Sequence, residues 1–362
     1  MTRILEPVIF RNGIQARNRV ALAAMTNGQS NADGTLGEDE LRWLEMRAAG
    51  GFGIIATCAA HVSKHGQGWP GELSIFDDAH IPGLRRVAET ICKYGSLPMV
   101  QIFHGGLRAD QSVSGTQPWS ASDAIETGND SGARAATEQD IQGVIADFAE
   151  SARRACKAGM AGVEIHGAHG YLLTQFLSRT ENRRSDAWGG SLENRSRLMR
   201  EVTRAVRAAV PDQFIVGVRL SPEDNGNARG LDLDENLQLA RWLCEDGVDF
   251  LHLSLWDCTK NTTKRPERHA LQELKVVVPQ DVPIFVAGQI WTQQDGDSAI
   301  NLGADVIALG RSAIINPDWP RRVADDEWQP QRTPVTADQL RAWGVNDTFI
   351  DRMRRRKDFV KA

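Results

Sequence analysis

One stretch of the chain decides its fold: residues 137–165, TEQDIQGVIADFAESARRACKAGMAGVEI. Apolar side chains recur in its first half with the i, i+3, i+4, i+7 spacing of one helix face, at Ile141, Val144, Ile145 and Phe148. Gly159 is a typical end of a helix. The run Val163–Ile165 follows, and short apolar runs of this kind are typical of strands in a buried parallel sheet. The stretch therefore predicts one helix followed by one strand.

The same alternation continues along the chain. The predicted strands are Val20–Ala24, Ile54–Thr57, Met99–Phe103, Val163–Ile165, Ile215–Arg219, Phe250–Ser254, Ile284–Ala287 and Val306–Leu309. Amphipathic helices are predicted between them, with Thr35-x-x-Glu38 as a capping box for the first and with Ser191 and Thr292 as caps of later ones. Eight strands, each followed by a helix, predict a (β/α)8 TIM barrel that forms a single domain over residues 1–362.

A doubly wound sheet is the structural alternative. Its phosphate fingerprint must follow a strand, whereas Gly51-x-Gly53-x-x-Ala56 precedes one. An Asn-Gly turn within Phe10–Ile14 predicts an N-terminal β-hairpin that closes the bottom of the barrel. Two long connections, residues 104–137 after the third strand and 171–190 after the fourth, are expected at the C-terminal face, where barrels build their active sites.

Composition excludes several classes of protein. The 42 Lys and Arg against 47 Asp and Glu give a net charge of −5, and the charges are interspersed, which argues against a nucleic-acid partner. The chain shows no apolar run long enough for a membrane span and no apolar signal core at its start. Its five cysteines are scattered without a CxxC, as in reduced proteins. We expect a cytoplasmic monomer or homo-oligomer without a bound metal.

The ends of the seventh and eighth predicted strands indicate a phosphate site. Barrels often hold a phosphate between the loops that follow these strands. Gly288 and Gly310 would let backbone N–H groups approach an anion closely, and Arg311 supplies a bidentate cation. The alternative is that both glycines form tight turns and that Arg311 pairs with a surface acid. We favour the phosphate.

Two histidines and a tyrosine, His166, His169 and Tyr171, follow the fourth predicted strand. A metal pair is disfavoured, because the chain has no HxH motif and the Glu164 side chain is expected on the other strand face. Two hydrogen-bond donors aimed at one carbonyl or anionic oxygen are the favoured interpretation, and two structural histidines are the third. Tyr171 either protonates a carbon beside that carbonyl or packs on the barrel rim.

Three further polar residues end predicted strands. Arg219 is costly to desolvate unless it faces an anion or a salt bridge across the barrel mouth. Gln101 can donate and accept at once, which suits the amide edge of a flat heterocycle or a bond to the neighbouring strand. Thr26 offers a single hydroxyl.

These residues lie in motifs that resemble the Old Yellow Enzyme family of FMN-dependent ene-reductases. The motifs are His166-Gly-Ala-His169-Gly-Tyr171-Leu-Leu-Thr-Gln-Phe-Leu-Ser178, Asn182–Arg195, Gln101-Ile-Phe-His104-Gly-Gly, Val218-Arg219-Leu-Ser-Pro222 and Ala308-Leu-Gly310-Arg311 with Asn316-Pro317-Asp318. They keep the family's order over nearly the whole chain. The family fold is a (β/α)8 barrel, which agrees with the independent prediction.

The resemblance implies that FMN lies across the barrel mouth. Its phosphate would be held around Gly288, Gln289, Gly310 and Arg311, and its ring would contact Ala24 and Met25 (backbone), Thr26 (flavin O4), Gln101 (pyrimidine edge) and Arg219 (N1 and C2=O). Phe103 matches a position that often shapes the substrate pocket, with plain core packing as its alternative.

The resemblance also implies a reaction. NAD(P)H would deliver a hydride to flavin N5 and leave, and an α,β-unsaturated carbonyl compound would bind with its oxygen on His166 and His169. The flavin would pass the hydride to the β-carbon, and Tyr171 would protonate the α-carbon. The alternatives are an oxidative demethylase or amine dehydrogenase of the same family, a metal-dependent barrel hydrolase, and a non-catalytic barrel that binds a phosphorylated ligand.

Two basic features depart from this pattern or lie outside it. Leu107 displaces the family's usual arginine to Arg108, which leaves a flavin contact by Arg108 open. The run Arg352–Lys357 either reaches a neighbouring subunit or forms a solvated helix face, and we expect the solvated face.

Overall fold

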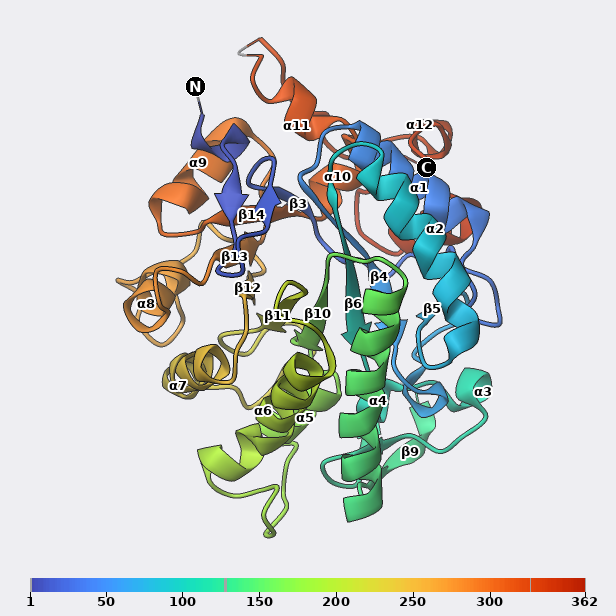
Figure 1. The fold of residues 1–362 in the computed structure, drawn as a ribbon, viewed down its shortest axis with the longest axis vertical. Helices are drawn as coiled ribbons and strands as arrows, with labels where there is room; N and C mark the ends of the chain where they lie inside the picture. Colours follow the sequence, from blue (N-terminus) through green and yellow to red (C-terminus); the bar gives the residue numbers. More distant parts are fainter. Residues whose placement is uncertain (1, 127–128, 326, 362) are drawn as a thin grey trace.

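A closed ring of parallel strands forms the centre of the molecule (Figure 1). The computed structural model describes residues 2–126, 129–325 and 327–361. The ring consists of β3 (Val20–Leu22), β4 (Ile54–His61), β6 (Leu97–Phe103), β10 (Gly162–Gly167), β11 (Ile215–Leu220), β12 (Phe250–Ser254), β13 (Ile284–Ala287) and β14 (Val306–Leu309). Strand β3 pairs in parallel with both β14 and β4, so the ring has no free edge. This confirms the predicted barrel and excludes the doubly wound sheet, whose two edges stay open.

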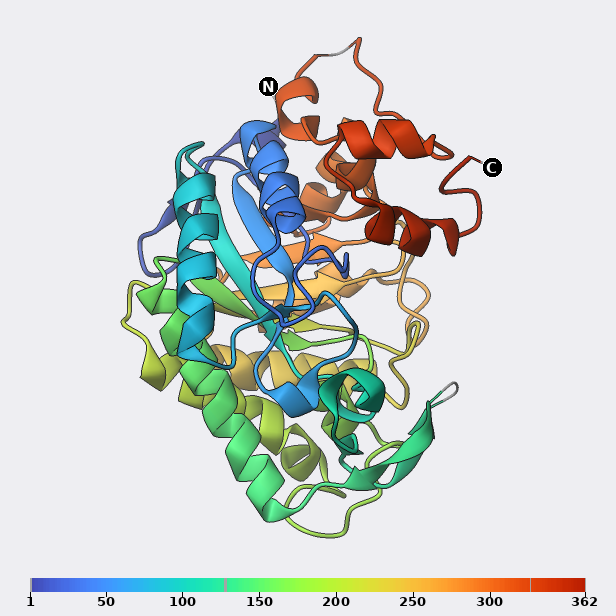
Figure 2. The same cartoon turned by 90° about the vertical axis from the view of Figure 1, so that its right-hand side faces the viewer.

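Helices surround the ring. They are α1 (Glu38–Ala49), α2 (Ile81–Cys92), α4 (Glu138–Lys157), α6 (Leu192–Ala209), α7 (Leu233–Glu245), α8 (Ala270–Val277), α9 (Gln293–Asn301) and α10 (Arg311–Ile315). Figure 2 shows the blue-to-green helices α1, α2 and α4 along the outside of the strands. Their apolar faces are buried because each carries the predicted helical repeat. Among the described residues, no helix has the length and apolarity to cross a membrane.

The predicted helix caps are confirmed except for one. Ser191 and Thr292 accept backbone N–H groups at the starts of α6 and α9. The prediction for Thr35 is wrong, since α1 begins after Gly37 without a side-chain cap. Thr35 instead donates its hydroxyl to the Asp33 carboxylate at 2.6 Å, within a turn that precedes the helix.

The predicted hairpin lies at the N-terminus. Strands β1 (Val8–Ile9) and β2 (Gln15–Ala16) pair antiparallel. The Phe10 ring packs against Phe250 and Phe285 of the barrel interior, with each pair of ring centroids 6.1 Å apart. The hairpin therefore closes the apolar end of the barrel and leaves the C-terminal ends of the strands as the place for a site.

Short elements fill the two long connections. Residues 104–137 contain η4 (Gly106–Arg108), α3 (Gln111–Ser114), β7 (Trp119–Ser120), β8 (Ala124–Glu126) and β9 (Asn129–Ala135), whereas 127–128 lie outside the described residues. Residues 171–190 contain α5 (Leu172–Leu177). The remaining elements are η1 (Arg3–Leu5), η2 (Lys64–Gly66), β5 (Leu73–Ser74), η3 (Asp78–His80), α11 (Trp319–Arg322), α12 (Ala337–Ala342) and α13 (Asp347–Arg354).

Candidate active site

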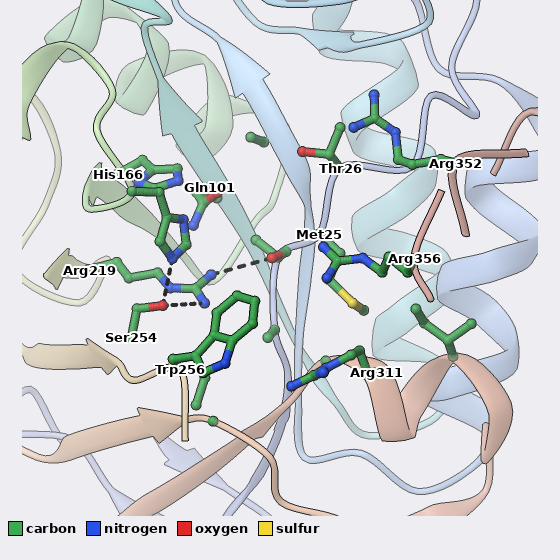
Figure 3. A pocket seen from close by; sticks show the side chains of 18 of the residues that line it. Met25, Thr26, Gln101, His166, Arg219, Ser254, Trp256, Arg311, Arg352 and Arg356 are labelled. Atoms are coloured by element: carbon green, nitrogen blue, oxygen red, sulfur yellow. Dashed lines mark hydrogen bonds between the residues drawn. The ribbon is translucent and has the colours of Figure 1, made fainter. Parts of the chain in front are cut away.

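A cavity of about 530 Å³ opens at the C-terminal ends of the barrel strands (Figure 3). Its size falls within the usual range for small-molecule and cofactor sites. The sequence-predicted residues that line it are Ala24, Met25, Thr26, Gln101, His166, His169, Tyr171, Arg219, Gly288, Gln289, Gly310 and Arg311. Phe103 is not part of the lining and stands behind it, fully buried, with its ring edge-on to that of Tyr171 at 5.2 Å.

His166 presents a neutral N–H donor to the cavity. Its Nδ1 accepts the backbone N–H of Ala168 at 3.2 Å, so the ring hydrogen lies on Nε2. Burial, reinforced by the nearby Arg219 cation, lowers the pKa of His166 to about 3. The imidazole is therefore uncharged at neutral pH and acts as a hydrogen-bond donor rather than as a cation.

His169 is held by a second hydrogen-bond chain. Arg219 Nη2 donates to Ser254 Oγ at 3.1 Å, and Ser254 Oγ lies 2.6 Å from His169 Nε2. When the serine hydroxyl donates onward to Nε2, the ring hydrogen of His169 is placed on Nδ1. Burial and the Arg219 cation hold the pKa of His169 well below its usual range, so this ring is also neutral. The two imidazole centroids are 4.9 Å apart, and both rings line the cavity.

Tyr171 stands beside this pair. Its ring centroid lies 5.0 Å from that of His166, and the Arg108 guanidinium covers its ring at 4.7 Å. Arg108 also donates to the His169 carbonyl at 3.0 Å. Arg108 is not part of the cavity lining, so its place is behind the histidine and tyrosine, where it fixes their loop.

The structure corrects the prediction for Glu164. Residues two apart on a strand share a face, and Glu164 therefore points into the barrel with His166. Its carboxylate accepts from Gln101 Nε2 at 2.6 Å and lies 2.6 Å from His252 Nδ1. Burial raises the pKa of Glu164, but His252, Arg219 and Gln101 outweigh it and set that pKa at about 2. A buried carboxylate thus orients Gln101 and leaves the Gln101 Oε1 atom as an acceptor.

The other end of the cavity suits an anion. The backbone N–H groups of Gly288, Gln289, Gly310 and Arg311 have no hydrogen-bond acceptor among the described residues. Gly288 has φ +154° and its backbone passes so close to Leu255 that a Cβ would stand 2.7 Å from that carbonyl oxygen. A Cβ at Gly310 would meet only Met25 Sδ, at 3.6 Å, and the lining of this end therefore stays open. Arg311 adds the cation.

Several lining residues were not predicted. They are Trp69, Ser254, Trp256, Phe349, Arg352, Met353, Arg355 and Arg356, among others. Ser254 ends a correctly predicted strand, so its position could have been inferred. The expectation of a wholly solvated basic run is wrong, because Arg352, Arg355 and Arg356 line the cavity. Only the packing of the C-terminal segment over the barrel mouth brings them there.

No metal site is apparent. Within the described ranges, no group of three or more His, Cys, Asp and Glu side chains is arranged to hold a metal ion. The nearby carboxylate, Glu164, is occupied by Gln101 and His252. The geometry thus gives the metal-dependent hydrolase no support.

Comparison with known proteins defines the family. Residues 3–328 match the model of the NADH:flavin oxidoreductase / NADH oxidase family. The chain is 36% identical over 329 residues to a probable NADH-dependent flavin oxidoreductase, YqiG, of Bacillus subtilis, covering 89% of this chain and 88% of that protein. It is 35% identical to the NADH:fumarate oxidoreductase of Klebsiella pneumoniae, of which it spans only 36%. The solved structure of an Old Yellow Enzyme homologue from Zymomonas mobilis has a TM-score of 0.81 and 29% identity, covering 93% of this chain and 96% of that one.

The fold and these matches define an NAD(P)H-dependent flavin oxidoreductase. The chain belongs to the NADH:flavin oxidoreductase / NADH oxidase family, to which Old Yellow Enzyme belongs.

Proposed function

We propose that this protein binds FMN in the cavity and reduces the activated C=C bond of α,β-unsaturated carbonyl compounds with electrons from NAD(P)H. The observation that carries the proposal is the convergence of two neutral imidazoles and one phenol at one end of a cavity whose other end suits a phosphate. When bound, FMN supplies a carrier that takes a hydride from the nicotinamide and gives it to the substrate.

The lining fits FMN. The open N–H groups beside Gly310 and Arg311 match a phosphate. Gln101 Oε1 can accept the imide N–H of the flavin pyrimidine ring, and Arg219 can stand by its C2 carbonyl. The buried Nε of Arg219 has no partner among the described residues, which a polar ring edge would supply. Thr26 lines the same cavity and offers its hydroxyl to the flavin O4.

The substrate end suits a carbonyl oxygen. His166 Nε2–H and His169 Nδ1–H donate to that oxygen and withdraw electron density from the conjugated β-carbon. Tyr171 then donates its phenolic proton to the α-carbon, which completes the reduction. Because both imidazoles are neutral, they polarise the carbonyl without adding a charge to the site.

An amine dehydrogenase or oxidative demethylase fits less well. A cationic amine needs an anionic or acceptor-rich pocket. The lining of the cavity contains five arginines and no Asp or Glu. Its electrostatics therefore favour neutral or anionic substrates.

The first test is the visible spectrum of the purified protein, which should show a flavin band. The dithionite-reduced protein should then be reoxidised on anaerobic mixing with 2-cyclohexenone. A colourless protein, or a reduced flavin that stays reduced, would overturn the proposal.

Tyr171→Phe is expected to slow reoxidation by 2-cyclohexenone about a hundredfold or more, because the α-carbon loses its proton donor. Reduction of the flavin by NAD(P)H should change little, since that step needs no proton on carbon. Stopped-flow absorbance follows both half-reactions. Tyr94→Phe is the matched control, because Tyr94 donates to Glu45 far from the cavity and is the only other tyrosine. Equal behaviour of the two variants would remove Tyr171 from the role of acid.

A further inference from the structure

The C-terminal helix α13 places the Arg352 guanidinium in the lining of the cavity, and the proposed function assigns no role to this group. Its guanidinium stands 5.7 Å above the Trp69 ring (Figure 3 shows it beside Thr26). Burial lowers the pKa of Arg352, and no hydrogen bond or ion pair joins it to another described residue. The guanidinium is half-buried, so it has lost part of its hydration and reaches the cavity with a charge to offer, and the arrangement favours an anionic ligand.

The carboxyl that acts on Arg352 electrostatically, Glu72, makes no ion pair with it. Glu72 accepts the backbone N–H groups of Gly68 and Trp69, at 2.7 and 3.3 Å, and so holds the loop that carries the Trp69 ring. Glu72 is fully buried, and burial raises its pKa well above the usual range. Burial therefore disfavours the charged form of this carboxyl. By contrast, Arg354 on the same helix pairs with Asp351 at 2.5 Å in solvent.

Arg352 lies at the substrate end of the cavity. Trp69 stacks on Phe103 with ring centroids 5.4 Å apart, and Phe103 meets Tyr171 at 5.2 Å. Arg352 thus stands over a continuous aromatic wall that ends at the proposed proton donor. Arg356 lies between Arg352 and Arg311 (Figure 3), because its charge lowers the pKa of both after burial does. The phosphate end therefore has cations of its own.

We propose that Arg352 binds a carboxylate of the substrate, so that the preferred substrates are α,β-unsaturated carbonyl compounds bearing a second, anionic group. This inference rests on the proposed function, which supplies the histidine pair as the anchor of the carbonyl. A guanidinium fork recognises a carboxylate and a phosphate by the same charge-assisted hydrogen bonds. The other source of such an anion is a phosphate of NAD(P)H, and the experiment separates the two.

The test compares (E)-4-oxopent-2-enoate with its methyl ester, which has the same skeleton without the charge. Both are mixed anaerobically with dithionite-reduced holoprotein, so that no nicotinamide is present. Arg352→Met should lower the second-order rate constant for the acid about tenfold to a hundredfold, the loss of a charge-assisted bond, and that for the ester less than about threefold. Arg354→Met removes the same charge from the same helix and should leave the ratio of acid to ester unchanged.

Binding provides a second readout that does not depend on turnover. Oxidised holoprotein is titrated calorimetrically with 4-oxopentanoate, the saturated product, and Arg352→Met should bind it more weakly by a similar factor. The methyl ester of 4-oxopentanoate should bind wild type and variant equally. Arg352→Lys, which keeps the charge and loses the fork, should be intermediate and guards against a folding defect in the methionine variant.

The outcomes are distinct. An equal loss for acid and ester, or no loss for either, would overturn the carboxylate site, as would slower flavin reduction by NADPH with an unchanged acid-to-ester ratio. If neither the acid nor its methyl ester reoxidises the reduced wild-type protein, the proposed function fails instead. The titration with 4-oxopentanoate then still decides whether Arg352 binds a carboxylate.

Discussion

Ser254 joins the two polar ends of the candidate site through one hydroxyl. It accepts from Arg219, which is assigned to the flavin, and contacts His169, which is assigned to the substrate. The serine therefore acts on the chemistry through the orientation and tautomer of His169. It is a positioning residue, because the proposed function gives the contacts with the substrate carbonyl to the histidines.

Ser254→Ala is expected to slow reoxidation by 2-cyclohexenone about fivefold to tenfold, the equivalent of one net hydrogen bond. The loss should fall mainly on the rate at saturating enone, because a His169 ring with its hydrogen on Nε2 donates in the wrong direction. Ser254→Thr keeps a hydroxyl and should restore most of the rate. A loss that Ser254→Thr does not restore, or one shared equally by flavin reduction, would show a general packing defect instead.

Single residues differ in how far the sequence could predict them. His166 lies near the C-terminal end of β10 and Tyr171 follows that strand, so a recognisable strand alone places both at the barrel mouth. The orientation of Glu164 was also accessible from the two-residue repeat, and the expectation failed because it ignored that repeat. Arg352 could not be predicted, because nothing local says that a helix after the last barrel strand turns back over the mouth.

At the scale of elements, local sequence predicts the long helices and the strands well. Strand β12 and strands β13 and β14 have the predicted bounds, since each run is bordered by turn residues. The short elements of residues 104–137 were not predicted, because two or three residues carry no period. The one predicted capping box was wrong, and the predicted caps Ser191 and Thr292 were right because each directly precedes its helix. Thr35 precedes Gly37, so its hydroxyl turns toward Asp33.

Thr137, which caps α4, and Thr35, which caps no helix, give a matched pair of variants. Thr137 Oγ1 accepts the Asp140 N–H at 3.2 Å, and the Asp140 carboxylate accepts the Thr137 N–H at 2.7 Å. Thr137→Ala should therefore lower the free energy of unfolding by about 1 kcal/mol, as loss of an N-cap does. Thr35→Ala removes only exposed turn bonds and should cost less than about 0.5 kcal/mol. Urea unfolding measures both, and equal costs would contradict the assignment of the caps.

At the scale of the whole molecule, closure of the barrel gathers histidines that the sequence scatters. His61, His104 and His166 come from β4, from the residue after β6 and from β10, and burial lowers the pKa of each to about 3. The number of barrel strands was predictable, because each strand and helix is a local unit. The burial of each histidine was not, because it depends on what the loops pack over it.

These histidines make stability depend on pH. A folded pKa of about 3 lies below the ordinary value of 6.5, so the unfolded chain takes up protons first as the pH falls. The contribution of each histidine to the free energy of unfolding is fully present above about pH 6.5. It is lost progressively as the pH falls from 6.5 to about 3. The buried acids Glu40 and Glu72, with raised pKa values, act in the opposite direction above about pH 4.5. The pH dependence of the free energy of unfolding of the whole protein therefore combines gains and losses. The contribution of one histidine is obtained by comparing wild type with a variant that lacks it.

His104 allows this measurement, because it is fully buried and lies outside the cavity lining. Between pH 7 and pH 4.5 the wild-type protein should lose about 2.5 kcal/mol more of its free energy of unfolding than His104→Gln, which keeps an acceptor for the Gly106 N–H and cannot be protonated. Urea unfolding of the flavin-loaded proteins, followed by tryptophan fluorescence at both pH values, gives the difference directly. Any packing defect of the variant appears equally at both pH values and cancels. An equal loss in the two proteins would mean that His104 takes up its proton in the folded state near its ordinary pKa, and hence that water reaches its ring.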